Sequence, residues 1–351
     1  MADLEAQLAE QVTAAAAAKR PLRIAGGATK TAILGRAIEG EVLAVGGHSG
    51  IVSYQPTELV LTARAGTPLT EIEAALAERG QALSFEPPHF GAGATLGGTL
   101  ACNLSGPARP WGGSIRDMVL GVRLINGQGE RLRFGGQVMK NVAGFDVSRL
   151  QAGALGTLGV ITEVSLKVLP KPQATMTLVE ESSDADAIQT MNRLAGRPWP
   201  ITGAAWFDHR VHLRLAGEPE AVQAARREMG AMAEGDESFW TELREQRLDF
   251  FRGAVPLWRL SVGSTAAPLE KGQATLIDWG GALRWLRGGE AAHRQDQAAK
   301  AGGHASLFRG GDRTGEVAHP LPPALVAVHR RLKAALDPAG VLNPGRLYGW
   351  L

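Results

Sequence analysis

Residues 22–36 read LRIAGGATKTAILGR, and the interpretation of the first part of the chain depends on them. A short apolar run ends at Gly26 and Gly27, and Thr29 and Lys30 follow closely. Two adjacent glycines let backbone amides turn toward an anion and approach it, because no side chain intervenes. The stretch therefore predicts a loop that cradles a phosphate. The alternative at this point is an ordinary glycine turn between two strands.

The two common phosphate-binding motifs do not fit this stretch. A P-loop requires G-x-x-x-x-G-K-[ST], and that spacing does not occur here. The dinucleotide fingerprint G-x-G-x-x-G opens a long helix, whereas here Gly26 and Gly27 are adjacent and Gly35 follows too soon for such a helix. A Rossmann-type nucleotide site is therefore not predicted.

Composition limits the class of protein. The chain has 351 residues, of which 44% are hydrophobic and 21% charged, so we expect a globular protein of two or three domains. A net charge of +2 without a basic stripe argues against a nucleic-acid partner. The single cysteine, Cys102, excludes an internal disulfide and a Cys-ligated iron–sulfur cluster, and we expect it to be a packed core side chain.

No targeting signal is evident. The N-terminus carries acidic residues where a secretory signal carries lysine or arginine, and no run reaches the length of a membrane-spanning helix. We therefore expect a cytoplasmic protein.

Periodicity divides the first part of the chain into short elements. Helices are predicted over 2–19 and within 66–81, the second with Thr67 or Thr70 as its N-cap. Residues 87–113 are predicted to be irregular, because glycine and proline dominate them. The predicted strands are 22–25, 41–45, 51–54, 58–65, a hairpin over 119–134, and a long strand over 159–170 with Val160, Thr162, Val164, Leu166 and Val168 on one face.

After Pro172 the pattern changes to β-α-β-β-α-β, which is the ferredoxin-like order. The predicted elements are strand 174–180, helix 184–195, strands 201–207 and 210–216, helix 219–230 and strand 257–262, with an extra helix over 236–249. A second partial copy follows: a hairpin over 275–286 closed by Gly280 and Gly281, helix 290–301 and strand 304–309. We expect one antiparallel sheet to hold both units, and a closing helix over 322–336.

Three stretches carry a resemblance to a known family. They are 24–35 (IAGGATKTAILG), 86–125 (EPPHFGAGATLGG through VLGVRLI) and 140–170 (KNVAGFDVSRLQAGALGTLGVITEVSLKVLP), and LDPAGVLNPGRLY at 336–348 adds to them. In this order and spacing they resemble the vanillyl-alcohol-oxidase/PCMH family of FAD proteins. The resemblance implies the fold class α+β: a PCMH-type FAD-binding domain of two α+β subdomains over 1–172, a cap domain with an antiparallel, ferredoxin-like sheet over 173–320, and a C-terminal helix and tail over 321–351 that return to the FAD domain.

The resemblance also implies which residues bind FAD. In this family a loop between two short strands of the first subdomain cradles the FAD pyrophosphate with backbone amides. By this likeness the cofactor-binding residues are Ala25, Gly26, Gly27, Ala28, Thr29, Lys30, Pro88, Thr95, Leu96, Gly97, Gly98, Asn103, Gly106, Gly112, Gly156, Gly159, Val160, Ile161 and Asn343. Several alternatives stay open: Lys30 as a solvated side chain, Thr95 and Asn103 as turn caps, and Asn343 as a helix stop.

Covalent attachment of the cofactor is not predicted. Many relatives attach FAD through a residue of the cradle, and the loop 25–30 contains neither histidine nor cysteine. His48 and His89 are interpreted as surface or capping histidines. The resemblance therefore implies noncovalent FAD.

The catalytic residues stay unknown from the sequence. Relatives that oxidise 2-hydroxy acids carry an H-x-G-D-G-N-x-H motif in the cap, and the nearest stretch here, around His304, lacks its second histidine. His209 and His212 would lie on opposite faces of a strand, so we predict no metal site. Lys140 and Asn141 precede the flavin-facing strand, where the family arrangement would let them reach the cofactor; loop capping is the alternative for Asn141.

Within the family, the resemblance implies a subunit of a complex that oxidises glycolate. The implied partners are a second FAD-type subunit and an iron–sulfur subunit, through which the chain would be cytoplasmic and in places peripheral at the inner membrane. A self-sufficient FAD oxidoreductase for another hydroxy acid or alcohol, and a non-catalytic scaffold subunit, remain the alternatives.

Overall fold

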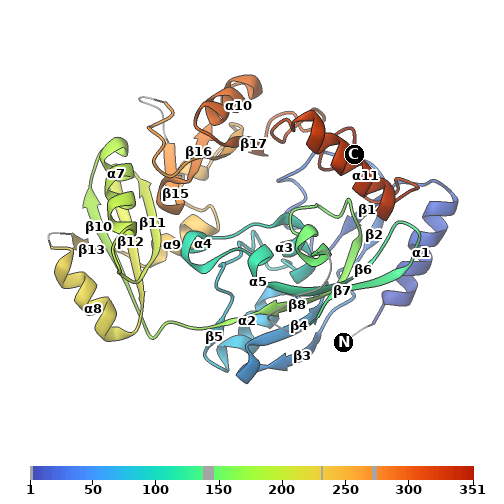
Figure 1. Ribbon diagram of the computed structural model, residues 1–351, viewed down its shortest axis with the longest axis horizontal. Coiled ribbons are helices and arrows are strands. Elements are labelled where there is room, and N and C mark those ends of the chain that lie inside the picture. Colours follow the sequence, from blue (N-terminus) through green and yellow to red (C-terminus); the bar gives the residue numbers. More distant parts are fainter. Residues whose placement is uncertain (1–2, 137–145, 231, 271–274) are drawn as a thin grey trace.

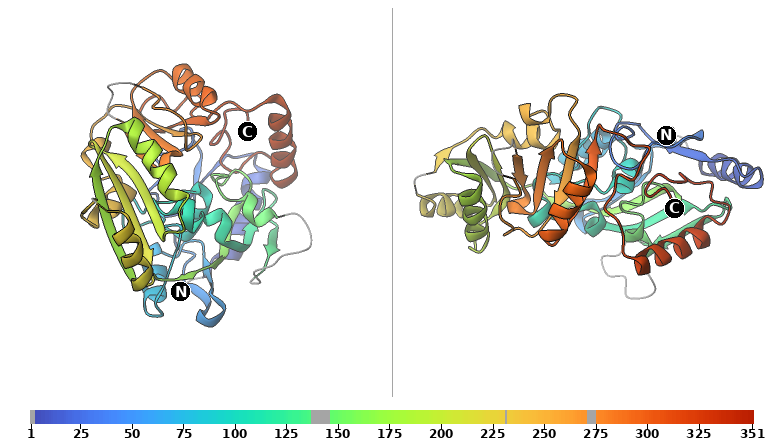
Figure 2. Two further views of the ribbon diagram at one scale, coloured as in Figure 1. Left: turned by 60° about the vertical axis from the view of Figure 1, so that its left-hand side comes forward. Right: turned by 90° about the horizontal axis from the view of Figure 1, so that it is seen from above.

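The computed structural model describes residues 3–136, 146–230, 232–270 and 275–351, which form an elongated α+β molecule (Figure 1). A five-stranded sheet belongs to the first part of the chain and an eight-stranded sheet to the second. Viewed from above, the two sheets lie side by side along the long axis of the molecule (Figure 2). This arrangement is the predicted α+β class.

The first part of the chain begins with α1 (Glu5–Ala17) and a parallel pair of short strands, β1 (Leu22–Ala25) and β2 (Glu41–Ala44). The five-stranded sheet is antiparallel in the order β3-β4-β8-β6-β7. Its strands are β3 (Ile51–Gln55), β4 (Val60–Arg64), β6 (Val119–Ile125), β7 (Arg131–Gly135) and β8 (Val160–Lys167). The smaller elements are η1 (Pro56–Glu58), α2 (Leu69–Ala77), α5 (Ile115–Met118), α6 (Val147–Leu150), and the two-residue strands β5 (Gln81–Ala82) and β9 (Leu169–Pro170), which pair with each other.

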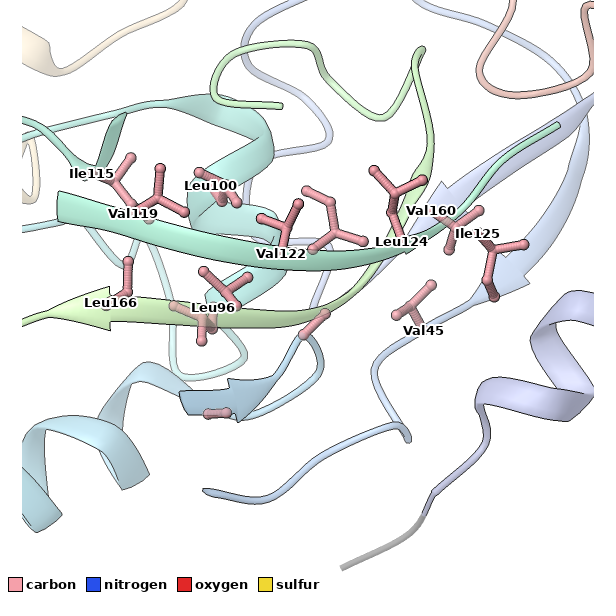
Figure 3. Close-up of a cluster of buried hydrophobic side chains, with 14 of the residues drawn as sticks. Val45, Leu96, Leu100, Ile115, Val119, Val122, Leu124, Ile125, Val160 and Leu166 are labelled. Carbon is pink, nitrogen blue, oxygen red and sulfur yellow. The ribbon is translucent and has the colours of Figure 1, made fainter. Parts of the chain in front are cut away.

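The core of this part lies between β6, β8 and α3 (Leu96–Cys102), as Figure 3 shows. Leu96 and Leu100 of α3 are fully buried there, together with Val160 of β8. The five residues that were predicted to share one face of this strand are all fully buried, and both faces of β8 are largely buried. The second face is covered by α1, whose Glu5 accepts a hydrogen bond from the Thr162 hydroxyl at 2.8 Å.

Helix α3 corrects the prediction that residues 87–113 are irregular, and a short helix, α4 (Arg109–Gly112), lies in the same stretch. Glycine disfavours helix, but Gly97 is required by close packing. Its amide donates to the carbonyl of Ala65 at 2.8 Å, and a Cβ at Gly97 would lie 2.6 Å from the Cβ of Ala65. The glycine that hid the helix from sequence analysis therefore lets it pack against the end of β4.

The predicted N-cap of α2 is also wrong. The helix starts after Pro68 without a side-chain cap. The Thr67 hydroxyl instead accepts a hydrogen bond from the amide of Gly50 at 2.9 Å, and Thr70 is exposed. Proline at the start of the helix supplies the required φ, so no side-chain cap is needed.

The eight-stranded sheet is antiparallel throughout and contains two ferredoxin-like units in the order β13-β10-β12-β11-β15-β16-β14-β17. The first unit consists of β10 (Ala174–Glu181), α7 (Asp184–Ala195), β11 (Ile201–Phe207), β12 (Arg210–Gly217), α8 (Pro219–Glu228) and β13 (Ala233–Glu234). The second consists of β14 (Leu257–Ser261), β15 (Thr275–Asp278), β16 (Leu283–Arg287), α10 (Ala291–Lys300) and β17 (His304–Arg309). Trp206 of β11 faces Ile277 of β15 where the units join.

The sequence predicts strand 257–262 as the closing strand of the first unit. In the structure this strand is β14 and belongs to the second unit. The closing strand of the first unit is β13, whose two residues are too few to show strand alternation in the sequence. The extra helix predicted over 236–249 is shorter: α9 covers Ser238–Arg244, and a 3₁₀ turn, η2, covers Asp249–Phe251.

The predicted hairpin within 275–286 is confirmed, with Asp278 of β15 opposite Leu283 of β16. Its connection is longer than the expected two glycines, since a 3₁₀ turn, η3 (Trp279–Gly281), joins the strands. Both strands are buried on both faces, because helices cover one face of the sheet and the first part of the chain approaches the other near this point.

The chain returns to its first part through α11 (Pro323–Leu336), drawn in red in Figure 1. Leu342 bridges in parallel to Leu22 of β1, and the amide of Asn343 donates to the Leu22 carbonyl at 3.0 Å. The predicted return of the tail is therefore present. The domain boundaries at residues 172 and 320 stay a prediction.

Candidate functional site

A cleft of the described residues lies beside β1, where three glycine-rich segments meet, and contains about 940 Å³ of space including its open mouth. It is lined by segments around 23–31, 95–102, 155–161 and 343–346, which are far apart in the sequence. The predicted site residues that line it are Ala25, Gly26, Gly27, Ala28, Thr29, Lys30, Thr95, Gly97, Gly98, Gly156, Gly159, Ile161 and Asn343. A cleft of this size and construction suits an extended small molecule.

The loop after β1 presents unpaired amides to this cleft. Within the described residues, no hydrogen bond is donated by the backbone amides of residues 26–30, although all of them line the cleft. Gly26 and Ala28 are exposed and Gly27 and Thr29 are half-buried, so these amides are open to solvent or to a ligand. Amides converging on one region stabilise negative charge there.

Gly26 and Gly27 are required by close approach. A Cβ at Gly27 would lie 1.4 Å from the carbonyl oxygen of Gly93, and one at Gly26 would lie 2.7 Å from the Oγ1 of Thr95. Neither glycine has positive φ; in this loop Ala28 has the left-handed conformation, with φ of 58°. The two glycines therefore let the loop rest directly on the segment that precedes α3.

Lys30 is not a solvated side chain, since only 8% of it is exposed. Its Nζ donates to the carbonyl of His89 at 3.2 Å and to the Thr29 hydroxyl at 3.4 Å. Burial lowers the pKa of the ammonium group, and the nearby Cys102 and Glu245 oppose that shift. No described carboxylate forms an ion pair with Lys30, so its charge is available to the cleft.

Sequence reasoning missed two arginines of the cleft, Arg23 and Arg346. Arg346 comes from the C-terminal tail, and its guanidinium donates to the carbonyls of Arg36 and, at 2.9 Å, Thr31. None of the described residues that line the cleft is acidic. Arg346 could have been predicted from the LNPGR sequence that contains Asn343. Because Asn343 was expected to return to the cofactor, Arg346, three residues later, should lie close to it as well.

Thr95 and Asn103, for which turn capping was the alternative role, lie at the two ends of α3 as its caps. Thr95 is the N-cap of α3, and its Oγ1 accepts from the amide of Gly98 at 3.3 Å, while its side chain also faces the cleft. Asn103 ends the same helix in a left-handed conformation and does not line the cleft. Its buried Oδ1 has no partner within the described chain.

Asn343 acts as a tie between segments. Its Oδ1 accepts from the amide of Ile24 at 2.8 Å, and its Nδ2 donates to the carbonyl of Leu155 at 2.6 Å. Both ends of the amide are therefore engaged by the protein. Asn343 positions β1 and the 155–161 segment along the cleft.

Five further predicted residues also lie away from the cleft, for different reasons. Leu96 and Val160 are fully buried in the core. Gly112 packs on the carbonyl of Ser84, from which a Cβ would lie 2.4 Å away. Pro88 and Gly106 line a second, smaller pocket beneath the eight-stranded sheet.

Comparison with known proteins agrees with this geometry. A model described as "FAD binding domain" matches residues 2–135, and one described as "FAD linked oxidases, C-terminal domain" matches residues 310–347. Glycolate oxidase subunit GlcE of Escherichia coli is 50% identical over 353 residues, covering 99% of this chain and 99% of that protein. This chain belongs to the glycolate oxidase subunit GlcE family.

Other similar proteins have lower sequence identity to this chain. Glycolate oxidase subunit GlcD of Bacillus subtilis is 37% identical over 110 residues, which cover 31% of this chain and 23% of that protein. In a solved structure of alkyldihydroxyacetonephosphate synthase, 97% of this chain and 75% of that one superpose with a TM-score of 0.67 at 18% identity, a likeness in fold alone. The GlcE-family chain is therefore a FAD-dependent oxidoreductase subunit with a PCMH-type fold.

The residues of the cleft fit the pyrophosphate of FAD. A pyrophosphate carries negative charge on several oxygens, which need hydrogen-bond donors and cations. The GlcE-family cleft offers both, in the free amides of residues 26–30 and in Arg23, Lys30 and Arg346. Because its glycines have no side chain, the ligand can reach the backbone amides directly.

No histidine is among the described residues that line the cleft, whereas Cys102 does line it. Cys102 packs on apolar neighbours, as predicted, but also faces the cleft, and burial raises the pKa of its thiol. His48 is buried and not a surface residue, and its Nδ1 accepts from the amide of Leu4 at 3.0 Å, just before α1. His89 pairs with Glu73 at 3.1 Å.

Within the described ranges, no three histidine, cysteine or acidic side chains gather as a metal site. His209 lies in the turn before β12, and His212 stacks on Phe239 with ring centroids 3.7 Å apart, so the expected opposite-face arrangement on one strand is wrong. Lys140 and Asn141 lie outside the described residues. The helices that are described are all too short or too polar to cross a bilayer.

Proposed function

We propose that this chain is the FAD-binding subunit of a glycolate oxidase complex, in which glycolate is oxidised to glyoxylate. The observation that carries the proposal is the run of amides at residues 26–30, which donate no hydrogen bond within the described chain. The described residues that line the cleft beside them include cations and no acidic side chain. The full-length similarity to glycolate oxidase subunit GlcE supplies the substrate.

In the proposed complex, residues 26–30 hold the FAD pyrophosphate noncovalently and Lys30, Arg23 and Arg346 balance its charge. When bound, FAD would accept the two electrons that leave the alcohol group of the substrate on oxidation. Asn343 fixes β1, so that the loop keeps its shape when no ligand is bound. We further propose that 1–172 is the FAD domain, 173–320 the cap domain, and 321–351 a tail that completes the FAD domain.

The proposed partners are a second FAD-type subunit and an iron–sulfur subunit. The chain has a single cysteine, so it cannot ligate an iron–sulfur cluster through cysteines of its own. Electrons from the flavin therefore leave through another subunit. We propose that this partner also brings the complex to the inner surface of the membrane, while the chain itself stays cytoplasmic.

Co-purification with flavin analysis tests the proposal. The chain is expressed with a tag, alone and together with the two proposed partner subunits, and each preparation is precipitated with acid to release noncovalent flavin. We expect FAD in the supernatant and both partners in the tagged complex. A folded chain that never contains flavin would be a scaffold, and a flavin-loaded chain that binds neither partner would favour a self-sufficient oxidoreductase.

A further inference from the structure

A second pocket lies where the two parts of the chain meet, beneath the hairpin of β15 and β16. It contains about 360 Å³ of space, which suits a ligand of a few heavy atoms. Segment 104–107 and Phe90 of the first part line it, and Arg259, Asp278 and Trp279 line it from the cap sheet. Phe90 also lies 5.8 Å from the Nζ of Lys30, so this pocket is close to the cleft already described.

Arg259 on β14 is a cation without a partner. Within the described chain its guanidinium forms no hydrogen bond and no ion pair, and it lies over the ring of Trp279 at 5.0 Å. Burial lowers the pKa of Arg259 to about 10, and the nearby Arg109 contributes in the same direction. The side chain is therefore still charged at neutral pH. Arg259 is half-buried, and the charge of Asp278 opposes the lowering of its pKa, but its N–H groups make no hydrogen bond within the described chain. A guanidinium with free N–H groups at a pocket is suited to receive an anion.

Asp278, at the end of β15, lines the same pocket but does not neutralise Arg259. Its carboxylate accepts from the amide of Trp279 at 2.7 Å, and no ion pair joins it to Arg259. Only 4% of Asp278 is exposed. The carboxyl group of Asp278 and the guanidinium of Arg259 thus line the same pocket without a hydrogen bond between them.

Two other arginines near the pocket are already paired. Arg244 of α9 forms an ion pair with Glu245 at 2.9 Å, and Arg214 of β12 forms one with Glu86 at 2.8 Å. Arg109 lies over the ring of Trp279 at 4.6 Å but does not line the pocket. Of the two described arginines that line the pocket, Arg244 and Arg259, Arg259 is therefore the one that is free to receive a ligand.

We infer that this pocket binds a small 2-hydroxy carboxylate, with the ligand carboxylate on the Arg259 guanidinium and its hydroxyl beside the protonated carboxyl of Asp278. The substrate class rests on the proposed function. Arginine donates two parallel hydrogen bonds to a carboxylate, and the rigid floor of Trp279 holds the guanidinium for them. The indole of Trp279 is itself fixed, since its Nε1 donates to the carbonyl of Gly106 at 3.0 Å.

The protonation of Asp278 follows from its surroundings. Burial raises its pKa to about 7; Glu86 adds to this shift, whereas the Trp279 amide, Arg214 and Arg259 oppose it. A bound anion raises the pKa further, because two negative charges in one pocket repel each other. Ligand binding is therefore coupled to proton uptake, and affinity falls as the pH rises above 7.

The inference is tested by titration calorimetry. Glycolate is added under anaerobic conditions to the full-length chain loaded with FAD. Arg259→Gln is expected to weaken glycolate binding about tenfold to a hundredfold, the loss typical of a charge-assisted hydrogen bond. Arg109→Gln is the matched comparison, because it removes the other cation on Trp279 without changing a residue that lines the pocket, and it should weaken glycolate binding much less than Arg259→Gln does. Ethylene glycol, a neutral two-carbon analogue, should not bind measurably. Equal affinity of the Arg259→Gln variant and the unaltered chain for glycolate would overturn the inference.

The pH dependence gives a second readout that a merely structural role would not produce. For the unaltered chain, glycolate affinity should decrease between pH 6 and 8, approaching tenfold per pH unit, and the binding heat should change with the ionisation enthalpy of the buffer. Asp278→Asn should bind glycolate with no such dependence. Proton release on binding, or an affinity that rises with pH, would contradict the assignment of Asp278. The FAD content of every variant is measured as well. A variant that loses glycolate binding but keeps its FAD identifies an effect on this pocket. An unaltered chain that does not bind FAD would instead contradict the proposed function.

Discussion

At the scale of single residues, Gly27 gives a direct test of the cradle. Because a Cβ there would lie 1.4 Å from the Gly93 carbonyl, Gly27→Ala has to displace backbone. We expect a loss of about 1–3 kcal/mol in stability and at least tenfold in FAD affinity. Gly196→Ala is the control, since Gly196 has negative φ and its nearest neighbouring atom would be 3.6 Å from the new Cβ. Fluorescence titration with FAD measures the affinity, and equal FAD affinity in the two variants would contradict the assignment.

Lys30 tests the charge of the cleft. Its ammonium is buried without an ion pair, so Lys30→Gln should fold and lose about tenfold in FAD affinity. Lys300→Gln, which removes an exposed lysine far from the cleft, should change nothing. Riboflavin, which lacks the phosphates, should bind both variants equally weakly. An FAD affinity unaffected by Lys30→Gln would place the pyrophosphate elsewhere.

The role of a residue could be predicted where a ligand has to reach the backbone and side chains must therefore be absent. It could not be predicted where the role depends on a contact with a residue far away in the sequence. The loop 25–30 could be found because two adjacent glycines end a short apolar run and are followed closely by Thr29 and Lys30. Arg259 and Asp278 carry no local signal: each is one polar residue in a strand, and only the sheet and the packing of two parts of the chain bring them to one pocket. Asn343 could be noticed, but its two backbone partners lie in segments that no local pattern connects.

At the scale of elements, the attachment of α11 depends on a buried ion pair. Lys333 and Asp337 lie 2.7 Å apart, and the ammonium also donates to the carbonyls of Thr157 and Leu342. Lys333→Met leaves Asp337 buried without its cation and should lower the free energy of unfolding by about 3–5 kcal/mol. The pair Lys300 and Asp296 has the same spacing and distance but is exposed, so Lys300→Met should cost under about 1 kcal/mol. Urea denaturation measures both, and similar costs would refute the role of burial.

Elements with regular periodicity were predicted well, and elements that exist because of packing were not. β10, β11 and β12 alternate clearly and were placed to within about a residue. Helix α3 contains two adjacent glycines, and it forms because Gly97 lets it rest on Ala65. The two-residue strand β13 exists because β10 offers it an edge, so the sequence placed the closing strand of the first unit at β14 instead.

At the scale of the whole molecule, the proposed division of labour predicts the behaviour of the isolated chain. It should contain or accept FAD, yet glycolate should bleach the flavin slowly or not at all under anaerobic conditions. The described residues contain no metal-binding group of side chains, and the single cysteine leaves no Cys-ligated cluster to receive electrons. Turnover should appear when both proposed partners are added. Stopped-flow absorbance decides the point: rapid bleaching by this chain alone would make it an enzyme in its own right.

The tie between β1 and the C-terminal tail also has a consequence for biosynthesis. Asn343 holds Ile24 across a separation of 319 residues, and Leu342 bridges to Leu22 beside it. During translation the cradle emerges from the ribosome early, but its supporting strand is secured only when residues 342 and 343 have also emerged. Nascent chains should therefore acquire the cofactor only after that point, and messages truncated before residue 343 should yield flavin-free products that proteases remove.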